Sequence, residues 1–379
     1  MAKLDEPLSI KGMHIRNRLV FPPITTNYAT SEGLVTEEIL SFYRQRAAGV
    51  GMVIVEATVV RRDGRITPYS LGIWCDEQVP GLARLTEAIK REGAAAVVQI
   101  AFAGARGVPS EEGIRGASPS GVRLRADVEP VVLTPEQIAE ITEAFAAAAF
   151  RAQKAGFDAV EVHGAHFYLI SQFLSPVTNK REDRYGGDTA RRATFAIEVV
   201  RAIRDRVGER YPILFRLNAY ETLEGGLDPA EAAAISRLLE EAGVDAIDAS
   251  AMLQCSWQET DGRRYLQAVS VLSKDQPRGA NVPSAAQIKQ AVHIPVITVG
   301  KLGEGELASQ VVSNGLADMV AIGRQMIADP NTAVKILSGR SDEIVWCKEC
   351  LSCLTSVVRR YGPLKCSVNK NPAGVPVYS

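Results

Sequence analysis

The sequence has no excess of charge of either sign, because its 379 residues include 43 Lys and Arg against 44 Asp and Glu, a formal net charge of −1. This balance argues against nucleic acid as a main partner. The sequence also lacks any run of about 18 uncharged apolar residues, so no membrane span is expected. The N-terminus lacks the apolar core of a secretory signal, and we therefore expect a cytoplasmic protein.

Cysteine is scarce over most of the chain. Cys75 and Cys255 stand alone, whereas the other four of the six lie close to the C-terminus, at Cys347, Cys350, Cys353 and Cys366. A disulfide scaffold would spread its cysteines through a small secreted domain. Clustered thiolates in a reducing compartment are typical of a metal site, which the tail of the chain therefore predicts.

Short β-branched runs alternate with amphipathic helical stretches along the rest of the chain. Strands are expected near 19–23, 52–58, 96–101, 158–163, 212–218, 245–249, 294–299 and 318–323. Helices are expected near 36–48, 80–91, 135–155, 189–207, 229–242, 284–292, 303–314 and 329–338. Eight strands alternating with eight helices predict an α/β fold of the (β/α)8 TIM-barrel type.

A doubly wound open sheet is the alternative to a barrel. Such a sheet normally carries a Gly-rich phosphate turn after its first strand. Here the first strand runs into PPITTNYAT, which contains no G-x-G-x-x-G. We therefore prefer the barrel, which takes about 250 residues. It leaves an N-terminal lead-in, a long insertion near 102–133 and the cysteine tail.

Candidate functional residues lie at the C-terminal ends of the expected strands, where TIM barrels carry their catalytic groups. These residues are Thr25, Thr26, Asn27, Gln99, His163, His166, Tyr168, Arg216, Gly300, Lys301, Gly323 and Arg324. The last two pairs follow the seventh and eighth strands, where barrels commonly bind a phosphate through backbone N–H groups and a basic side chain.

Each of these residues also has a structural interpretation. Gln99 and Arg216 can be satisfied polar groups of the barrel interior, and His163 and His166 can be core histidines. An Arg among apolar residues is nevertheless costly unless it meets an anion. Together the residues predict a ring of donors and a cation around a flat, electron-rich ligand with a phosphate, a description that FMN satisfies.

Several segments carry a resemblance to a known family. The longest is AGFDAVEVHGAHFYLISQFLSPVTNKREDRYGG (155–187), and shorter ones are IRNRLVFPPIT, VIVEATVV, VVQIAFAG and ADMVAIGR. Over residues 5–338 the chain resembles the Old Yellow Enzyme family of FMN-dependent NADH:flavin oxidoreductases, which are barrel proteins.

The resemblance implies a role for each site residue. Cofactor-binding residues would be Pro23, Thr25, Ala57, Gln99, Arg216, Gly300, Lys301, Gly323 and Arg324. Thr25 would bond flavin O4, Gln99 the pyrimidine edge, and Arg216 would face the N1/O2 side. His163 and His166 would hold the carbonyl oxygen of the substrate, and Tyr168 would supply a proton. The chain departs from the family at Phe102, where a histidine is usual, and at Thr194, where the motif has an arginine, while Arg192 is retained.

The cysteine spacing Cys347-x2-Cys350-x2-Cys353-x12-Cys366 supplies four thiolates, the ligand set of a [4Fe–4S] cluster. Structural zinc and unligated thiols are the alternatives. Three close cysteines with a distant fourth favour iron–sulfur over the two C-x2-C knuckles usual for zinc. The tail resembles the iron–sulfur branch of the family, which includes bacterial 2,4-dienoyl-CoA reductase and trimethylamine dehydrogenase and has the pattern C-x2-C-x3-C-x11-C.

We therefore expect an FMN-binding barrel at 1–340 and a [4Fe–4S]-binding extension at 341–379. The expected activity is reduction of the C=C bond of an α,β-unsaturated carbonyl compound, with enoyl- or dienoyl-CoA thioesters among the candidate substrates. An oxidative amine demethylase and an electron-relay subunit are the alternatives. Larger relatives continue into a nucleotide-binding domain, whereas this sequence stops at Ser379. We expect electrons from a separate donor protein or NAD(P)H, and assembly into a homo-oligomer.

Overall fold

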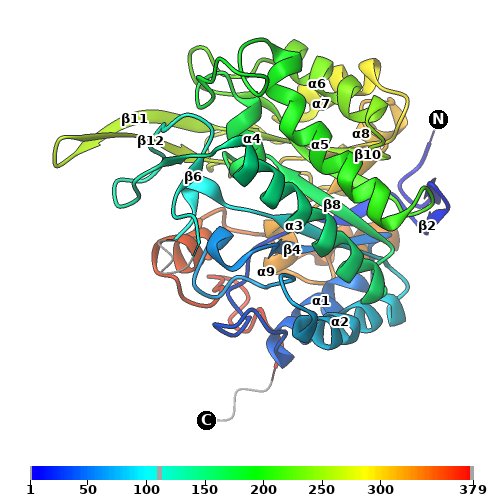
Figure 1. The fold of residues 1–379 in the computed structure, drawn as a ribbon. Helices are drawn as coiled ribbons and strands as arrows, with labels where there is room; N and C mark the ends of the chain where they lie inside the picture. The colour runs from blue at the N-terminus through cyan, green and yellow to red at the C-terminus, as the bar shows by residue number, and fades with distance from the viewer. Residues whose placement is uncertain (1, 109–112, 376–379) are drawn as a thin grey trace.

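Eight parallel strands close into a barrel in the computed structural model, which describes residues 2–108 and 113–375 (Figure 1). In chain order the strands are β3 (Leu19–Phe21), β4 (Met52–Val59), β5 (Ala95–Ala101), β8 (Ala159–Gly164), β9 (Ile213–Glu221), β10 (Ala246–Met252), β13 (Val296–Val299) and β14 (Met319–Ala321). Each pairs in parallel with its two neighbours, and β14 closes the barrel on β3. The predicted TIM barrel is confirmed, and each strand lies within or overlaps a predicted range.

Helices cover the outside of the barrel (Figure 1). They are α1 (Glu37–Ala47), α2 (Val79–Arg91), α3 (Pro135–Lys154), α5 (Thr189–Val207), α6 (Pro229–Glu241), α7 (Val282–Ala291), α8 (Gly305–Ser313), α9 (Arg324–Ala328) and α10 (Thr332–Leu337). Thr134 and Gln137 form a capping box at the start of α3, and Gly156 follows its end with a φ of 84°. The helix predicted at 329–338 is shorter than expected, because Pro330 separates α9 from α10.

The barrel interior changes character along its axis. Alternate residues of a strand face the same side, so one face of each strand lines the interior. At the N-terminal end this lining is an apolar cluster that includes Val97, Ala159, Leu214 and Ala246. A hairpin of β1 (Leu8–Ile10) and β2 (Met13–Ile15) contributes Ile10, Met13 and Ile15 to the same cluster. Two residues further along four of these strands, the interior positions are polar.

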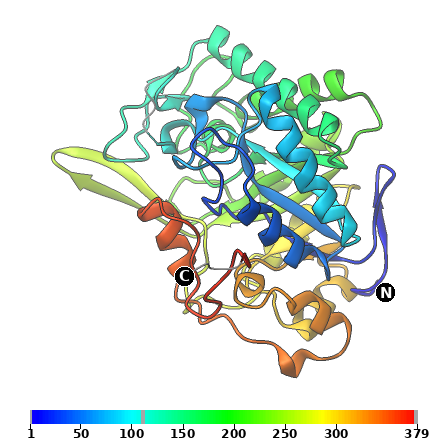
Figure 2. The same cartoon turned by 90° about the horizontal axis from the view of Figure 1, so that it is seen from below.

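One prominent element was not predicted. Strands β11 (Gln254–Thr260) and β12 (Arg263–Val269) form an antiparallel hairpin that projects from the barrel in both views (Figures 1 and 2). Its turn places Asp261 and Gly262 at φ values of 52° and 69°, as a two-residue turn with left-handed residues requires. The described part of the insertion expected near 102–133 contains one 3-10 turn (Gly104–Arg106) and the short strands β6 (Ala117–Ser118) and β7 (Val131–Val132).

The cysteine tail packs against the segment between β3 and α1, as Figure 2 shows in red and blue. Asn27 donates from Nδ2 to the carbonyls of Val357 and Gly362 at 3.1 and 3.0 Å, and Leu364 N donates to Thr26 O at 2.8 Å. The tail is therefore fixed to the barrel on one side of its C-terminal end. Within the described ranges, no helix combines the length and apolar character that crossing a membrane requires.

Candidate functional site

A cavity of about 300 Å³ opens at the C-terminal end of the barrel. It is lined by every residue predicted for cofactor or substrate: Pro23, Thr25, Ala57, Gln99, His163, His166, Tyr168, Arg216, Gly300, Lys301, Gly323 and Arg324. The structure therefore brings together residues spread over three hundred positions of sequence. The individual roles of these residues stay predictions. Thr26 and Asn27, by contrast, face the barrel wall and the tail.

The two histidines and the tyrosine form one aromatic group after β8. The ring of His163 lies 5.1 Å from that of His166 and 4.9 Å from that of Tyr168, both in edge-to-face geometry. The backbone turns sharply here, with φ values of 62° at His166 and 53° at Phe167. Asn218 holds the turn, because its Oδ1 accepts from His166 N at 3.0 Å.

Hydrogen bonds restrict which ring nitrogen of each histidine can carry the proton. His163 Nδ1 accepts from Ala165 N at 3.3 Å, which assigns the ring proton of neutral His163 to Nε2. His166 Nε2 lies 2.8 Å from Ser250 Oγ. Burial lowers the pKa of both histidines well below its usual value, and the charge of Arg216 adds to this effect. Both rings are therefore neutral near pH 7, and each can donate one hydrogen bond.

Tyr168 is a protonated phenol under the same conditions. Burial raises the pKa of its hydroxyl above the usual value, and Arg106, 5.6 Å from the ring centre, opposes this only in part. Arg106 is itself held by hydrogen bonds to the carbonyls of His166 and Ala268. The site thus places a neutral acid next to two neutral hydrogen-bond donors.

Charged side chains lie one interior position below this group. Gln99 Nε2 donates to Glu161 Oε2 at 2.6 Å, and Arg216 Nη1 lies 3.2 Å from Asp248 Oδ2. Arg216 therefore meets the anion that its apolar neighbours in sequence require. Sequence reasoning missed Glu161 and Asp248, although the alternation in AVEVH and DAIDA places both on the interior face.

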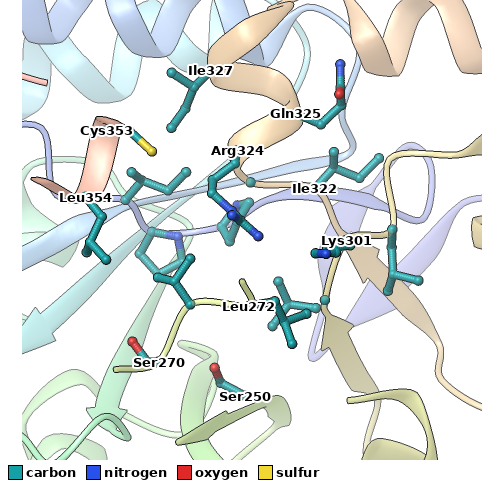
Figure 3. Close-up of a pocket in the computed structure, with 18 of the residues that line it drawn as sticks. Ser250, Ser270, Leu272, Lys301, Ile322, Arg324, Gln325, Ile327, Cys353 and Leu354 are labelled. Carbon is teal, nitrogen blue, oxygen red and sulfur yellow. The ribbon is translucent and has the colours of Figure 1, made fainter. Parts of the chain in front are cut away.

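The other side of the cavity carries the predicted phosphate loops. Lys301 Nζ donates to the carbonyls of Lys274 and Gln276 at 3.0 and 2.8 Å and pairs with Glu349 at 2.6 Å. Its three donors are therefore used within the chain. Figure 3 shows Arg324 near the middle of the cavity, with Lys301 on one side and Cys353 on the other.

This side of the cavity fits the phosphate of FMN. Arg324 Nη1 is buried and donates to no other group of the described chain, so an anion there would supply its missing partner. A Cβ at Gly323 would lie only 3.3 Å from Pro22 Cγ, so a larger residue would crowd the loop. Arg216 Nε and Nη1 are likewise buried without a hydrogen-bond partner among the described residues. Within the described chain these cationic donors make no hydrogen bond, so they can bond the acceptor oxygens of a phosphate-bearing ligand, which FMN is.

The four tail cysteines line one small second cavity, together with Arg324 and Ile327. Cys347 and Cys353 also line the main cavity, so the two cavities share a wall. Among the described residues, no three His, Cys, Asp or Glu side chains are arranged to hold a metal ion. The iron–sulfur cluster therefore stays a prediction.

The family departures lie outside the main cavity. Phe102 is buried and packs below Gly64 and Arg61. Arg192 pairs with Glu231 and donates from Nε to Leu174 O at 2.9 Å, a structural role. Ser250 lines the cavity and was not predicted, since a serine at a strand end carries no distinctive signal.

Comparison with known proteins places the chain in a family. Residues 3–343 match the NADH:flavin oxidoreductase / NADH oxidase family. The chain is 39% identical over 376 residues to the NADH oxidase of Thermoanaerobacter brockii, which covers 98% of this chain and 56% of that protein.

Two solved structures are similar over 98% of this chain at 28% identity. A 2-naphthoyl-CoA reductase in complex with 2-naphthoyl-CoA gives a TM-score of 0.90 over 57% of its length. Histamine dehydrogenase from Rhizobium sp. 4-9 gives 0.85 over 52%. The chain spans little more than half the length of each of these relatives. The chain belongs to the NADH:flavin oxidoreductase / NADH oxidase family, the Old Yellow Enzyme family that its motifs resemble.

Proposed function

We propose that the protein is an FMN-dependent ene-reductase that reduces the C=C bond of an α,β-unsaturated carbonyl compound. The observation that carries the proposal is the group of His163, His166 and Tyr168, which faces the same cavity as Arg216 and Arg324. When bound, FMN supplies the hydride that such a reduction adds to the β-carbon. The chain's own side chains then have to bind the carbonyl oxygen and deliver a proton.

Neutral imidazoles suit the first of these tasks. His163 has its Nε2 proton free for a carbonyl oxygen, because Nδ1 already accepts from the backbone. His166 can offer a proton from Nδ1 when Ser250 donates to its Nε2. Two hydrogen bonds to the carbonyl oxygen stabilise the negative charge that develops there as the β-carbon is reduced.

Tyr168 suits the second task. Its hydroxyl is protonated, and its ring packs against that of His163, so the acid lies next to the carbonyl-binding group. We assign it the protonation of the α-carbon, a general-acid role. Its ring also packs against Ala57, Ile66, Ala101 and Ala103, none of which has a titratable side chain.

An acyl-CoA thioester is the substrate class that we favour. The similarity to 2-naphthoyl-CoA reductase supports this choice, since that protein was solved with an acyl-CoA thioester bound. A thioester carbonyl offers the same oxygen to the two histidines as a ketone does. Enoyl- and dienoyl-CoA compounds are therefore the first substrates to test.

Amine oxidation is the second candidate, and the similarity to histamine dehydrogenase supports it. We rank it lower because an amine substrate needs a group that accepts its proton. The lowered pKa makes both histidines weak bases, and Tyr168 is a protonated phenol. A pure electron-relay subunit is ranked last, because it has no use for a carbonyl-binding group inside the cavity.

We further propose that Cys347, Cys350, Cys353 and Cys366 hold a [4Fe–4S] cluster. Their shared cavity and its common wall with the main cavity support this. Such a cluster supplies one-electron transfer. A separate one-electron donor, either a ferredoxin or a flavoprotein, would then be the source of electrons, with NAD(P)H as the alternative.

The test is anaerobic purification of the protein followed by cofactor and activity measurements. We expect released FMN, four irons and four sulfides per chain, and oxidation of the reduced protein by an enone or enoyl-CoA. A measurement of one zinc ion per chain, without iron or sulfide, would show that the four cysteines form a structural zinc site and not a cluster. Protein that takes up no FMN, or that reduces no alkene and oxidises amines instead, would overturn the ene-reductase assignment.

A further inference from the structure

Four polar side chains from four consecutive barrel strands form a buried layer below the cavity. Gln99 of β5 is in register with Glu161 of β8, and Arg216 of β9 is in register with Asp248 of β10. Strands β8 and β9 are themselves paired, which joins the two halves of the layer. Gln99 and Arg216 also line the cavity, whereas Glu161 and Asp248 are fully buried behind them.

The hydrogen bonds of this layer are incomplete. Glu161 Oε1 and both oxygens of Asp248 are buried and accept no hydrogen bond from the described residues, although Arg216 lies close enough to Asp248 for an ion pair. Buried carboxylate oxygens without donors are costly. A proton held between the two carboxyl groups would supply the missing donor, as in other buried carboxyl pairs.

Electrostatics indicate where this proton lies. Burial and the facing Asp248 raise the pKa of Glu161 well above its usual value. Burial also raises the pKa of Asp248, but the charge of Arg216 opposes the rise. Glu161 is therefore the protonated partner, and Asp248 is the anion that faces Arg216.

We propose that Glu161 and Asp248 are positioning residues that share one proton and fix, through Arg216, the charge that the cavity presents to its cofactor. They touch neither the cofactor nor the substrate and act only through Arg216 and Gln99. The proposal rests on FMN binding in the cavity and adds to the proposed function the group that sets the cofactor's redox potential.

The charge balance of the layer makes the proposal specific. With one proton on the pair, Arg216 and Asp248 sum to zero, and the cofactor meets an oriented dipole. Loss of the Asp248 charge leaves an uncompensated cation, which favours the reduced, more negative cofactor. Loss of the Glu161 carboxyl removes no charge, because that group is already neutral. The FMN midpoint potential is thus expected to respond differently when Glu161 or Asp248 is replaced by the corresponding amide.

The experiment compares the FMN midpoint potential of the holoprotein with those of three variants at a single pH. Asp248→Asn should raise the ratio of affinities for reduced and oxidised FMN at least about tenfold, or about 30 mV for a two-electron couple. Glu161→Gln should leave the potential unchanged, because the amide keeps a neutral group opposite Gln99.

Asp245→Asn is the matched control. Asp245 precedes β10 at the opposite end of the barrel and pairs with Arg204 at 2.7 Å and Lys11 at 3.1 Å. This substitution removes one carboxylate next to the start of β10 without touching the layer, so the FMN midpoint potential should not change. Equal shifts in Glu161→Gln and Asp248→Asn would show that both carboxyls are ionised, and an unshifted Asp248→Asn would show that the pair does not act through Arg216. Either result overturns the proposal.

Infrared spectroscopy tests the shared proton independently. The parent protein in alkaline buffer should show a protonated carboxyl band that shifts in D2O and is missing from Glu161→Gln. This measurement decides the question even if Asp248→Asn fails to fold or to retain FMN. Parent protein that binds no FMN would defeat the proposed function, whereas a missing infrared band would defeat this inference alone.

Discussion

The two sides of the main cavity are built in different ways. The substrate side, defined by His163, His166, Tyr168 and Ser250, comes from strand ends and the turn that follows β8. The phosphate side, defined by Lys301, Gly323, Arg324 and Cys353, comes from the loops after β13 and β14, the first residue of α9 and the tail. On the substrate side, His166 meets Ser250 at 2.8 Å, and the ring of His163 packs edge to face against those of His166 and Tyr168. Side chains of the phosphate side either bond to distant loops, like Lys301, or carry a donor with no partner in the described part of the chain, like Arg324.

This difference predicts that the substrate side determines the reaction rate, whereas the phosphate side determines how tightly the cofactor is held. A hydrogen-bonded group on strands holds its geometry without a ligand, which is what proton transfer needs. Free donors on loops are satisfied only when a ligand arrives. Changes on the substrate side should therefore alter reaction rates with the cofactor still bound. Changes on the phosphate side should alter cofactor or electron supply with the chemistry intact.

Tyr168→Phe should give the largest effect, because it should slow the reaction with the alkene without changing FMN binding. Removal of a positioned general acid typically costs about 10²–10⁴-fold in rate. Oxidation of the reduced protein by an enone or enoyl-CoA should slow by that factor in stopped-flow measurements, while FMN content and flavin reduction stay as in the parent. A fully active variant on several alkenes would show that the proton comes from elsewhere.

The pH dependence of alkene reduction by the parent protein also tests the general-acid role of Tyr168. Because burial raises the pKa of Tyr168, its acid form persists up to and beyond the usual value of about 10. The rate of alkene reduction should therefore stay level through neutral and moderately alkaline pH. Because the pKa of both histidines is lowered, carbonyl binding should also not change as pH falls through about 6.5, where an ordinary histidine becomes charged.

Arg324→Ala tests the phosphate side. Its buried Nη1 has no partner within the described chain, so a charge-assisted contact to a phosphate is the natural use of that donor. Its loss should weaken FMN binding by about 1.5–3 kcal/mol, or roughly 10- to 150-fold in Kd, measured by flavin release on dilution.

Lys301→Met is the matched comparison on the same side. Its ammonium is already satisfied by two carbonyls and Glu349, so FMN retention should fall less than in Arg324→Ala. If FMN retention fell more in Lys301→Met than in Arg324→Ala, the phosphate contact would be assigned to Lys301 and not to Arg324. Alkene reduction at saturating FMN should match the parent in both.

Cys353→Ser tests electron supply through the wall that the two cavities share. If the four cysteines hold a cluster that passes electrons on, reduction of bound FMN by a low-potential one-electron donor should slow by at least an order of magnitude. Cys75→Ser, which removes a thiol far from the tail in sequence, is the control. Fast reduction by NAD(P)H that survives in Cys353→Ser would make the cysteines structural.

The barrel could be predicted from sequence because its signals are local. The alternation of strand and helix periods acts within a few residues, and the barrel that it predicts was confirmed. The Thr134 cap and the glycine at 156 are signals of the same local kind. The hairpin of β11 and β12 was missed because it projects from the barrel and β11 is exposed or half-buried throughout. A buried–exposed alternation is present only at Leu266, Gln267 and Ala268 of β12, which is too short to indicate a strand. The Asp261-Gly262 turn of the hairpin was the signal that could have revealed it.

The residues that line the cavity could also be predicted from the sequence, because the C-terminal ends of barrel strands meet at one end of the barrel. The partners of its residues were not. Ser250 meets His166 from 84 positions away, and Asp248 of β10 meets Arg216 of the neighbouring strand β9. Such pairs depend on register and on side-chain direction, which no local pattern encodes.

Ser250→Ala should give the smallest effect, and it separates the two histidines within the substrate side. Ser250 Oγ lies 2.8 Å from His166 Nε2 and is the group that can hold the His166 proton on Nδ1. Its loss removes one neutral hydrogen bond, worth about 0.5–1.5 kcal/mol, or roughly 2- to 12-fold in affinity. We expect weaker binding of phenolic or enone ligands by that factor, measured by titration of the flavin absorbance, with FMN retention unchanged. Ser250→Thr keeps the hydroxyl and should restore binding. Loss of FMN in Ser250→Ala would instead tie the serine to the cofactor, and the division between the two sides would fail at this residue.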